Sequence, residues 1–438
     1  MPQPEFRAAH ARKQRKHACF LYSTIAAACA ALGACATTPI ATPITTTTTE
    51  TNAAVRAPTL HDSLFTLDTH LDTPASFVTA RGFDILKRHD VERDGSQVDV
   101  PRMDEGGLDG GFWVIFTPQG ALSTEAYRQV RDTALLRALA IHEMVARSPD
   151  VFALVTTPDE AREAHAEGKK IVFISIENSY PLGEDLSLLE TFYKMGVRMV
   201  GPVHTANNQF ADSSTDRDGP KHGGLSPLGR ELVKEANRLG MVLDASHASD
   251  EVLDQMIDLS ATPVILSHSG TNDVYDHPRN VPDALLVKLA KSGGVIQMNA
   301  LGRYLADIPP SPERDAKLKA LRAKWGDTDA LTGEAYEAFL DELGAINAEY
   351  PAQMADFEDY MKQVLHAIKL VGVDHVGFGA DWDGGGGLSG YRDITALPKL
   401  SERLLAEGYT RDDLQKMWSG NLLRLVQQAQ DYAASQKS

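Results

Sequence analysis

The feature of this sequence that most constrains its fold is a regular alternation of short apolar runs and longer helical patterns after residue 59. Each apolar run is rich in β-branched residues, which is typical of a strand buried on both faces of a parallel sheet. The eight predicted strands are Phe65–Asp72, Gly111–Phe116, Ile171–Glu177, Val197–Val203, Met241–Ser246, Pro263–Ser267, Gly294–Asn299 and His375–Ala380.

Helical periodicity fills the connections between these runs, for example over Ser123–Ser148, Pro227–Leu239, Asp250–Leu259 and Pro282–Lys291. Strands that alternate with helices pair in parallel through right-handed crossovers. Eight such units favour an α/β fold of the (β/α)8, or TIM-barrel, type. A doubly wound open sheet would alternate in the same way and remains the alternative at this point.

One stretch is too long for a plain connection between strands seven and eight. Pro309 to Tyr360 is charged and contains two helical patterns, Glu313–Trp325 and Gly333–Tyr350. We therefore predict a helical insertion at about residues 305–360, as a candidate cover for one end of the barrel.

Ionisable residues stand at the ends of most of the predicted strands. In a barrel, the carboxyl ends of all eight strands meet at one mouth, where catalysis takes place. Four histidines and three carboxylates in the same register are hard to explain by packing, so they predict a functional site. These residues are His70, Asp72, Glu177, His204, His247, His268 and Asp381.

The residue types in this set indicate a metal site. His70 and Asp72 are two positions apart, so their side chains project from the same face of a strand. Imidazole and carboxylate groups suit zinc or a similar divalent ion. The set is too large for one tetrahedral zinc, whereas two ions about 3.5–4 Å apart that share a carboxylate would explain it.

The N-terminal segment has the pattern of an export signal. Basic residues precede a largely apolar stretch, Ala18–Ala34, that is too short for a comfortable membrane span. The stretch ends in Leu32-Gly33-Ala34-Cys35, which resembles a bacterial lipoprotein signal, in which the cysteine is lipidated. An ordinary signal cut after an alanine is the alternative. The absence of Asp directly after Cys35 predicts sorting to the outer membrane.

These patterns divide the chain into a signal peptide over residues 1–34, a Thr- and Pro-rich tether over 35–58, and a barrel domain over 59–438. We expect an exported, periplasmic protein whose only membrane contact is the lipidated Cys35. The chain has 60 acidic and 43 basic residues, which argues against binding to nucleic acid.

The residues around the strand ends form seven motifs in a fixed order. They are Asp68-Thr69-His70-Leu71-Asp72-Thr73-Pro74, Ser175-Ile176-Glu177, Val203-His204-Thr205, Asp244-Ala245-Ser246-His247, Leu266-Ser267-His268-Ser269, Arg279-Asn280-Val281-Pro282 and Gly377-Phe378-Gly379-Ala380-Asp381-Trp382-Asp383-Gly384. Together, from about residue 60 to residue 430, they resemble the membrane (renal-type) dipeptidase family, peptidase family M19.

The resemblance implies a barrel of the metal-dependent amidohydrolase type with two zinc ions per chain, bridged by Glu177 and a hydroxide. His70, Asp72 and Glu177 would hold one ion. Glu177, His247 and His268 would hold the other. The resemblance also implies a homodimer.

The same resemblance implies roles for residues that do not hold metal. His204 would face the carbonyl oxygen of the substrate, and Arg279 would bind its C-terminal carboxylate. Asp381 would serve the proton transfers and the amino end of the substrate. Glu177, His204 and Asp381 are thus the expected catalytic residues.

The expected activity is zinc-dependent hydrolysis of dipeptides, including those with a D-residue at the C-terminal position. A related binuclear amidohydrolase that cleaves another amide or a lactam is the first alternative. A non-catalytic lipoprotein that binds metal or peptide is the second, although every expected ligand position is filled.

Overall fold

The structure is a computed structural model, and it describes residues 59–437. The predicted signal peptide, the lipidated Cys35 and the tether lie outside the described residues.

Eight parallel strands form a closed ring, which confirms the (β/α)8 fold. One sheet has the order β1-β2-β4-β5-β6, and the ring strands of the other have the order β10-β9-β7. Single bridges between Asp244 and Ile265 and between Leu71 and Trp382 join the two sheets. The ring strands are β1 (Leu67–Leu71), β2 (Gly110–Ile115), β4 (Lys170–Ile176), β5 (Val197–Val200), β6 (Val242–Leu243), β7 (Ile265–Thr271), β9 (Val295–Met298) and β10 (Val376–Phe378).

Two further strands pair with the ring from outside, and the sequence did not indicate either of them. β3 (Phe152–Leu154) pairs with the first residues of β4. β8 (Asn280–Val281) pairs with the last residues of β7. This second pairing brings Arg279, the residue before β8, to the carboxyl end of the ring.

Helices surround the ring, and the four predicted helical patterns all appear as helices. Serine side chains cap three of them, because Ser123, Ser226 and Ser249 each accept a hydrogen bond from a backbone N–H of the first turn. The helices are α1 (Pro74–Phe77), α2 (Val100–Gly106), α3 (Thr124–Arg147), α4 (Pro158–Ala166), α5 (Ser187–Lys194), α6 (Pro227–Leu239), α7 (Asp250–Leu259), α8 (Asp283–Lys291), α9 (Pro312–Trp325), α10 (Gly333–Glu349), α11 (Phe357–Val371), α12 (Leu397–Ala406), α13 (Arg411–Gln415) and α14 (Asn421–Ser435).

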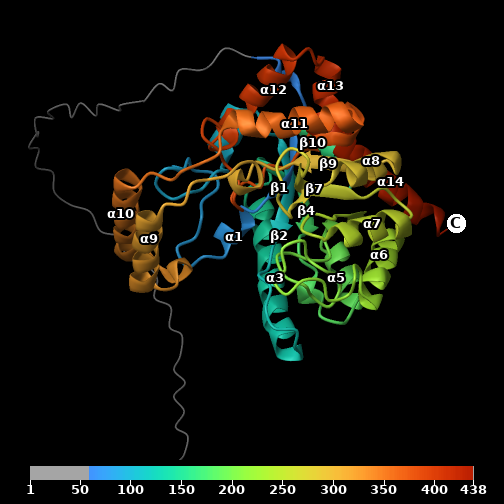
Figure 1. Cartoon of the computed structure of the whole chain (residues 1–438), viewed down its shortest axis with the longest axis horizontal. Coiled ribbons are helices and arrows are strands. Elements are labelled where there is room, and N and C mark those ends of the chain that lie inside the picture. The colour runs from blue at the N-terminus through green and yellow to red at the C-terminus, as the bar shows by residue number, and fades with distance from the viewer. Residues whose placement is uncertain (1–58, 438) are drawn as a thin grey trace, which may run out of the picture. The chain divides into compact units, whose positions relative to one another are not determined.

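The helical insertion lies between β9 and β10, the seventh and eighth strands of the ring, and consists mainly of α9 and α10. These two helices pack against each other and stand apart from the helices around the ring (Figure 1). Contacts with the segment after α1 hold them: Arg93 pairs with Glu337 at 2.5 Å and with Asp341 at 3.2 Å. The guanidinium of Arg81 lies over the ring of Tyr336, 4.4 Å from its centroid.

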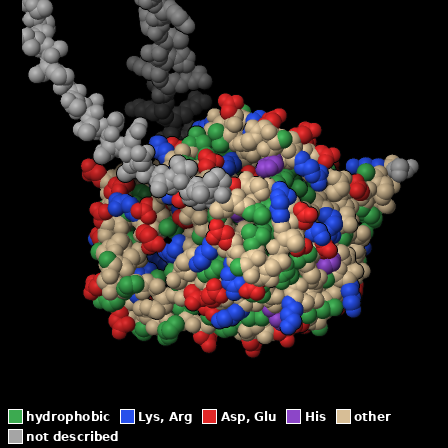
Figure 2. Space-filling model, turned by 90° about the horizontal axis from the view of Figure 1, so that it is seen from above, with side chains coloured by type: hydrophobic (Ala, Val, Ile, Leu, Met, Phe, Trp, Pro, Cys, Tyr) green, Lys and Arg blue, Asp and Glu red, His purple; other side chains and the backbone are tan. Residues whose placement is uncertain are grey.

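The surface of the barrel domain carries both signs of charge. Figure 2 shows acidic and basic side chains interspersed over one face of the molecule. Within residues 59–437, no helix is both long and apolar enough to cross a bilayer.

Candidate metal centre and active site

One carboxylate oxygen, Oε1 of Glu177, is the centre of a cluster of imidazoles. It lies 3.0 Å from Nε2 of His247 and 3.5 Å from Nε2 of His268. Nε2 of His204 is also 3.5 Å away, and Nε2 of His70 is 3.8 Å away. Glu177 follows β4, so four histidines from different strand ends meet at the residue that was predicted to bridge two ions.

His70 also faces the other two predicted carboxylates. Its Nε2 lies 3.6 Å from Oδ2 of Asp72 and 4.0 Å from Oδ1 of Asp381. Three groups of side chains offer ligand atoms within 4.8 Å of one another: His70, Glu177 and His268; Glu177, His204 and His247; and His70, Asp72 and Asp381. The structure thus brings all seven strand-end residues together, and it places His204 and Asp381 in such groups.

The cluster has the properties of a cation site. Within residues 59–437, neither Nε2 of His70 nor Oδ1 of Asp72 has a hydrogen-bond partner, although both atoms are buried. Buried polar atoms normally have partners, so these two need an explanation. The donor atoms are nitrogen and oxygen only, a set that fits zinc or a similar divalent ion.

The charges within the cluster also favour a bound cation. Burial raises the pKa of the Glu177 carboxyl, and the charge of His70 offsets only part of this effect. Burial lowers the pKa of His70, but the charges of Glu177, Asp72 and Asp381 outweigh it and raise this pKa to about 10. The carboxylates around His70 therefore attract a positive charge, and a divalent ion can supply it in place of the proton.

The other three histidines are held in their neutral form. Burial, with the nearby charge of Arg279, lowers the pKa of His247 well below the usual value. Burial, with the charges of His70 and Arg279, does the same to the pKa of His268. Burial and the charge of Arg279 lower the pKa of His204 to about 3. Neutral imidazole is the form that binds metal or donates a single hydrogen bond.

Hydrogen bonds to neighbouring groups fix the orientation of the ligands. Nδ1 of His268 contacts Oγ of Ser267 at 2.8 Å, and that hydroxyl donates to Asp244 at 2.6 Å. Asp68 accepts from the backbone N–H of His70 at 2.8 Å and from that of Ala380 at 3.1 Å. Such outer contacts hold metal ligands in place.

The backbone at the mouth is strained where functional side chains project. His247 has φ of 69° and Asp381 has φ of 66°, in the left-handed region that non-glycine residues rarely adopt. Next to them, Gly384 leaves space that a side chain would fill, because an added Cβ would lie 2.2 Å from oxygens of Asp381 and Asp72.

Arg279 is buried at the edge of the cluster, with one part of its guanidinium free. Nη2 donates to the backbone oxygen of His268 at 3.0 Å, and Nη1 contacts Oγ of Ser269 at 3.4 Å. Nε is buried and has no partner among residues 59–437. The guanidinium is thus fixed in place but retains hydrogen-bonding capacity for a ligand.

Two aromatic residues that were not among the predicted site residues also border the site. The ring of Tyr304 lies under the guanidinium of Arg279, with 5.4 Å between the ring centroid and Cζ. The ring of Phe116 lies 4.7 Å from that of His204. Phe116 ends a predicted strand, a position that could have marked it as a neighbour of the site, whereas Tyr304 ends a short 3-10 helix, Gly302–Tyr304, that has no comparable signal.

Comparison with known protein families gives a match over most of the chain. The family model described as membrane dipeptidase (peptidase family M19) matches residues 54–438. The dipeptidase aclJ of Aspergillus oryzae is 30% identical over 345 residues, which cover 77% of this chain and 71% of that protein. An uncharacterized dipeptidase of Schizosaccharomyces pombe is 27% identical, with 84% of this chain and 82% of that protein covered.

Solved structures give a similar result. The probable dipeptidase PvdM from Pseudomonas aeruginosa is 30% identical and superimposes with a TM-score of 0.71, over 85% of this chain and 97% of that one. A metallopeptidase from Rhodobacter sphaeroides, solved with a phosphinate mimic of the dipeptide L-Ala-D-Ala, shares the fold at 24% identity and a TM-score of 0.64, over 84% of this chain and 99% of that one.

Proposed function

This chain belongs to the membrane dipeptidase family, peptidase family M19, and is thus a metal-dependent dipeptidase, and we propose that it uses two bound zinc ions to hydrolyse dipeptides. The observation that carries this proposal is the position of Oε1 of Glu177, which lies within 3.0–3.8 Å of four imidazole nitrogens. One carboxylate at the centre of so many ligands is suited to bridge two cations.

In this proposal, His70, Asp72 and Glu177 hold one ion, and Glu177, His247 and His268 hold the other. When bound, the two ions would supply a water nucleophile at neutral pH and would polarise the scissile carbonyl. Ser267 and Asp68 hold His268 and the backbone of His70 in the orientation that this binding needs.

His204 is placed to stabilise the oxyanion that forms on the substrate. Its neutral imidazole has one N–H to donate, and the rings of Phe116 and His247 fix its plane. Loss of one such donor typically costs roughly 10²–10³ in rate.

Asp381 is the proposed carrier of the proton from the nucleophile to the leaving nitrogen. Burial raises the pKa of its carboxyl, and the charge of His70 opposes this effect only in part. A carboxyl whose pKa lies closer to neutrality can both accept and release a proton at physiological pH. The strained backbone at Asp381 directs this group into the mouth.

Arg279 would select short substrates by binding their free C-terminal carboxylate, which a guanidinium matches as a planar fork. The L-Ala-D-Ala mimic bound by the R. sphaeroides relative supports the proposal that this chain also accepts a D-residue at the C-terminal position.

The function is tested by loading the purified protein with zinc and offering dipeptides whose second residue is either L or D. We expect hydrolysis, close to two zinc ions per chain by elemental analysis, and loss of activity on treatment with a chelator. Full activity of a metal-free protein would contradict the proposed metal-dependent function. Hydrolysis of N-acyl amino acids or lactams but not of dipeptides would favour the alternative amidohydrolase.

Arg279→Ala should lower kcat/KM for dipeptides by about 10- to 100-fold, mainly through KM, because a charge-assisted hydrogen bond is lost. Dipeptide amides, which lack the carboxylate, should be poor substrates of the wild type and should lose little more in the variant. Zinc content serves as the control, since Arg279 also bonds to the backbone of His268. Unchanged dipeptide kinetics would show that the assignment of Arg279 is wrong.

A further inference from the structure

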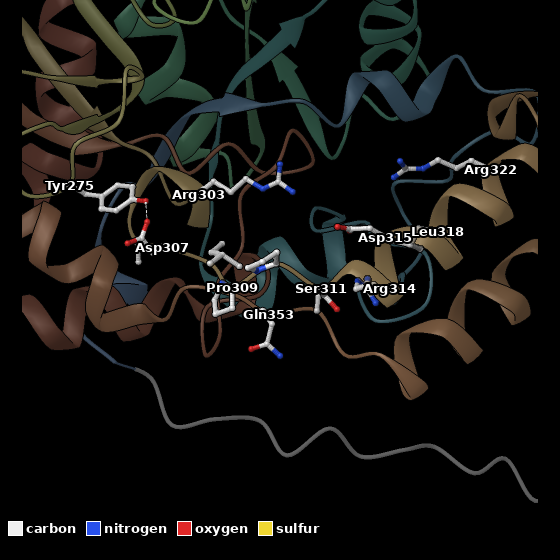
Figure 3. A pocket seen from close by; sticks show the side chains of 14 residues that line it. Tyr275, Arg303, Asp307, Pro309, Ser311, Arg314, Asp315, Leu318, Arg322 and Gln353 are labelled. Atoms are coloured by element: carbon white, nitrogen blue, oxygen red, sulfur yellow. Dashed lines mark hydrogen bonds between the residues drawn. The ribbon is translucent and has the colours of Figure 1, made fainter.

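Two cavities adjoin the mouth, and one arginine lines both of them. The first, of about 1010 Å³, is lined by Thr205, His277, Tyr304 and Gly385 and by the charged residues Asp216, Arg217, Asp218 and Arg303. Asp216 is already engaged, because its carboxylate accepts from the backbone N–H groups of Asn207 at 2.6 Å and of Asp218 at 2.8 Å. The second, of about 730 Å³, lies between the loop after β9 and one side of α9, from Ser311 to Arg322 (Figure 3). Arg303 belongs to the lining of both, so its side chain lies where the mouth and the helical insertion come together.

The second cavity has an excess of cationic side chains. Arg303, Arg314 and Arg322 line it, together with the acids Asp307 and Asp315. Figure 3 shows Arg303 and Arg322 extending toward each other from opposite sides. Both side chains are exposed, and within residues 59–437 neither makes a hydrogen bond or an ion pair with another residue, so both are open to an anion.

The remaining charges of this cavity are partly engaged. Arg314 donates to the backbone oxygen of Tyr350 at 2.6 Å and to Asn347 at 2.9 Å, both at the end of α10. Asp307 accepts from the hydroxyl of Tyr275 at 2.8 Å, on the side away from Arg322. Asp315 projects from α9 near Arg322 and reduces the positive charge there without cancelling that of Arg303.

The first cavity lies on the Arg279 side of the mouth. Its lining residue Tyr304 contacts the guanidinium of Arg279, and its lining residue His277 accepts a hydrogen bond from the backbone N–H of Arg279 at 3.1 Å. If Arg279 holds the C-terminal carboxylate of a dipeptide, the side chain of that C-terminal residue would lie beside this cavity, whose lining includes Arg303.

We propose that Arg303, with Arg322 across the second cavity, selects dipeptides whose C-terminal residue carries an anionic side chain. The inference rests on the proposed dipeptidase function and on the role given to Arg279. It assigns to the helical insertion a part in substrate choice, because Arg322 comes from α9.

The test compares zinc-loaded enzyme on pairs of dipeptides that differ only in charge, Ala-Glu with Ala-Gln and Ala-Asp with Ala-Asn, in both configurations of the second residue. In the wild type we expect kcat/KM to favour the acidic member by about 10- to 100-fold, through KM. Arg303→Met should bring the two members of a pair close to equality, and Arg322→Met should reduce the preference. Arg128→Met, at an exposed position of α3, is the matched control and should keep it.

The ratio within a pair is the readout, so a general loss of activity in a variant does not affect it. If Ala-Ala is cleaved but the wild type treats acidic and amide substrates alike, this inference is overturned and the dipeptidase function stands. A preference that survives both Arg303→Met and Arg322→Met overturns the assignment of these arginines. Failure to cleave any dipeptide overturns the proposed function together with the inference.

Discussion

Glu177→Gln is expected to lower kcat for dipeptide hydrolysis by about 10³-fold or more, since the metal contribution amounts to several kcal/mol. The change keeps the shape of the side chain but removes the charge at the point where four imidazole nitrogens converge. An uncharged amide is a poor bridge between two cations, and one of its two ends would present N–H groups to the ligands. We therefore expect the zinc content to fall as well.

Kinetics and elemental analysis of the same preparation check this expectation. Glu163→Gln, the same change at an exposed position of α4, is the matched control and should keep both activity and metal. A Glu177→Gln protein with two zinc ions and normal turnover would contradict the bridging role.

Asp381→Asn should lower kcat by about 10²–10⁴-fold, because an amide cannot carry the proton from the nucleophile to the leaving nitrogen. The effect should fall on kcat more than on KM, and two zinc ions should remain bound. Turnover, KM and zinc content are measured together, with Asp150→Asn at an exposed site as the control.

The zinc content of Asp381→Asn decides between two roles for this residue. Its Oδ1 lies 4.0 Å from Nε2 of His70, so Asp381 is also in reach of a cation held there. Loss of one zinc ion in the variant would make Asp381 a metal ligand and would contradict the proposed proton carrier.

Much of the fold could be predicted because the ring strands have a strong local signal. The run Ile171–Glu177, for example, is apolar almost throughout, since β4 is buried on both faces, and its polar end marks the mouth. β3 and β8 lack such a signal. They contain only three and two residues, and each is defined by pairing with a distant strand.

The part of the candidate site that the ring strands carry was predictable as well, because those strands have a strong local signal. Strand order in a barrel brings His70, Glu177 and His268 together whatever the loops do. The positions of Tyr304 and Arg303 depend instead on the conformation of the loop after β9, for which spacing in the sequence carries no rule. The unpaired state of Arg303 becomes visible only when the insertion is placed in space.

The two bridges that close the ring have a consequence for how this enzyme should be assayed. Each seam between the two sheets has one backbone bridge, Asp244 with Ile265 or Leu71 with Trp382. Side-chain hydrogen bonds, Ser267 to Asp244 at one seam and Ala380 N–H to Asp68 at the other, supplement the bridges. Glu177 follows β4 of one sheet, whereas His268 lies in β7 and Asp381 follows β10 of the other. We expect a molecule opened at a seam to keep most of its helices, and so most of its far-ultraviolet spectrum, but to lack a complete catalytic set. The rate of turnover therefore reports the fraction of molecules with an intact ring, whereas far-ultraviolet spectroscopy reports only the content of secondary structure.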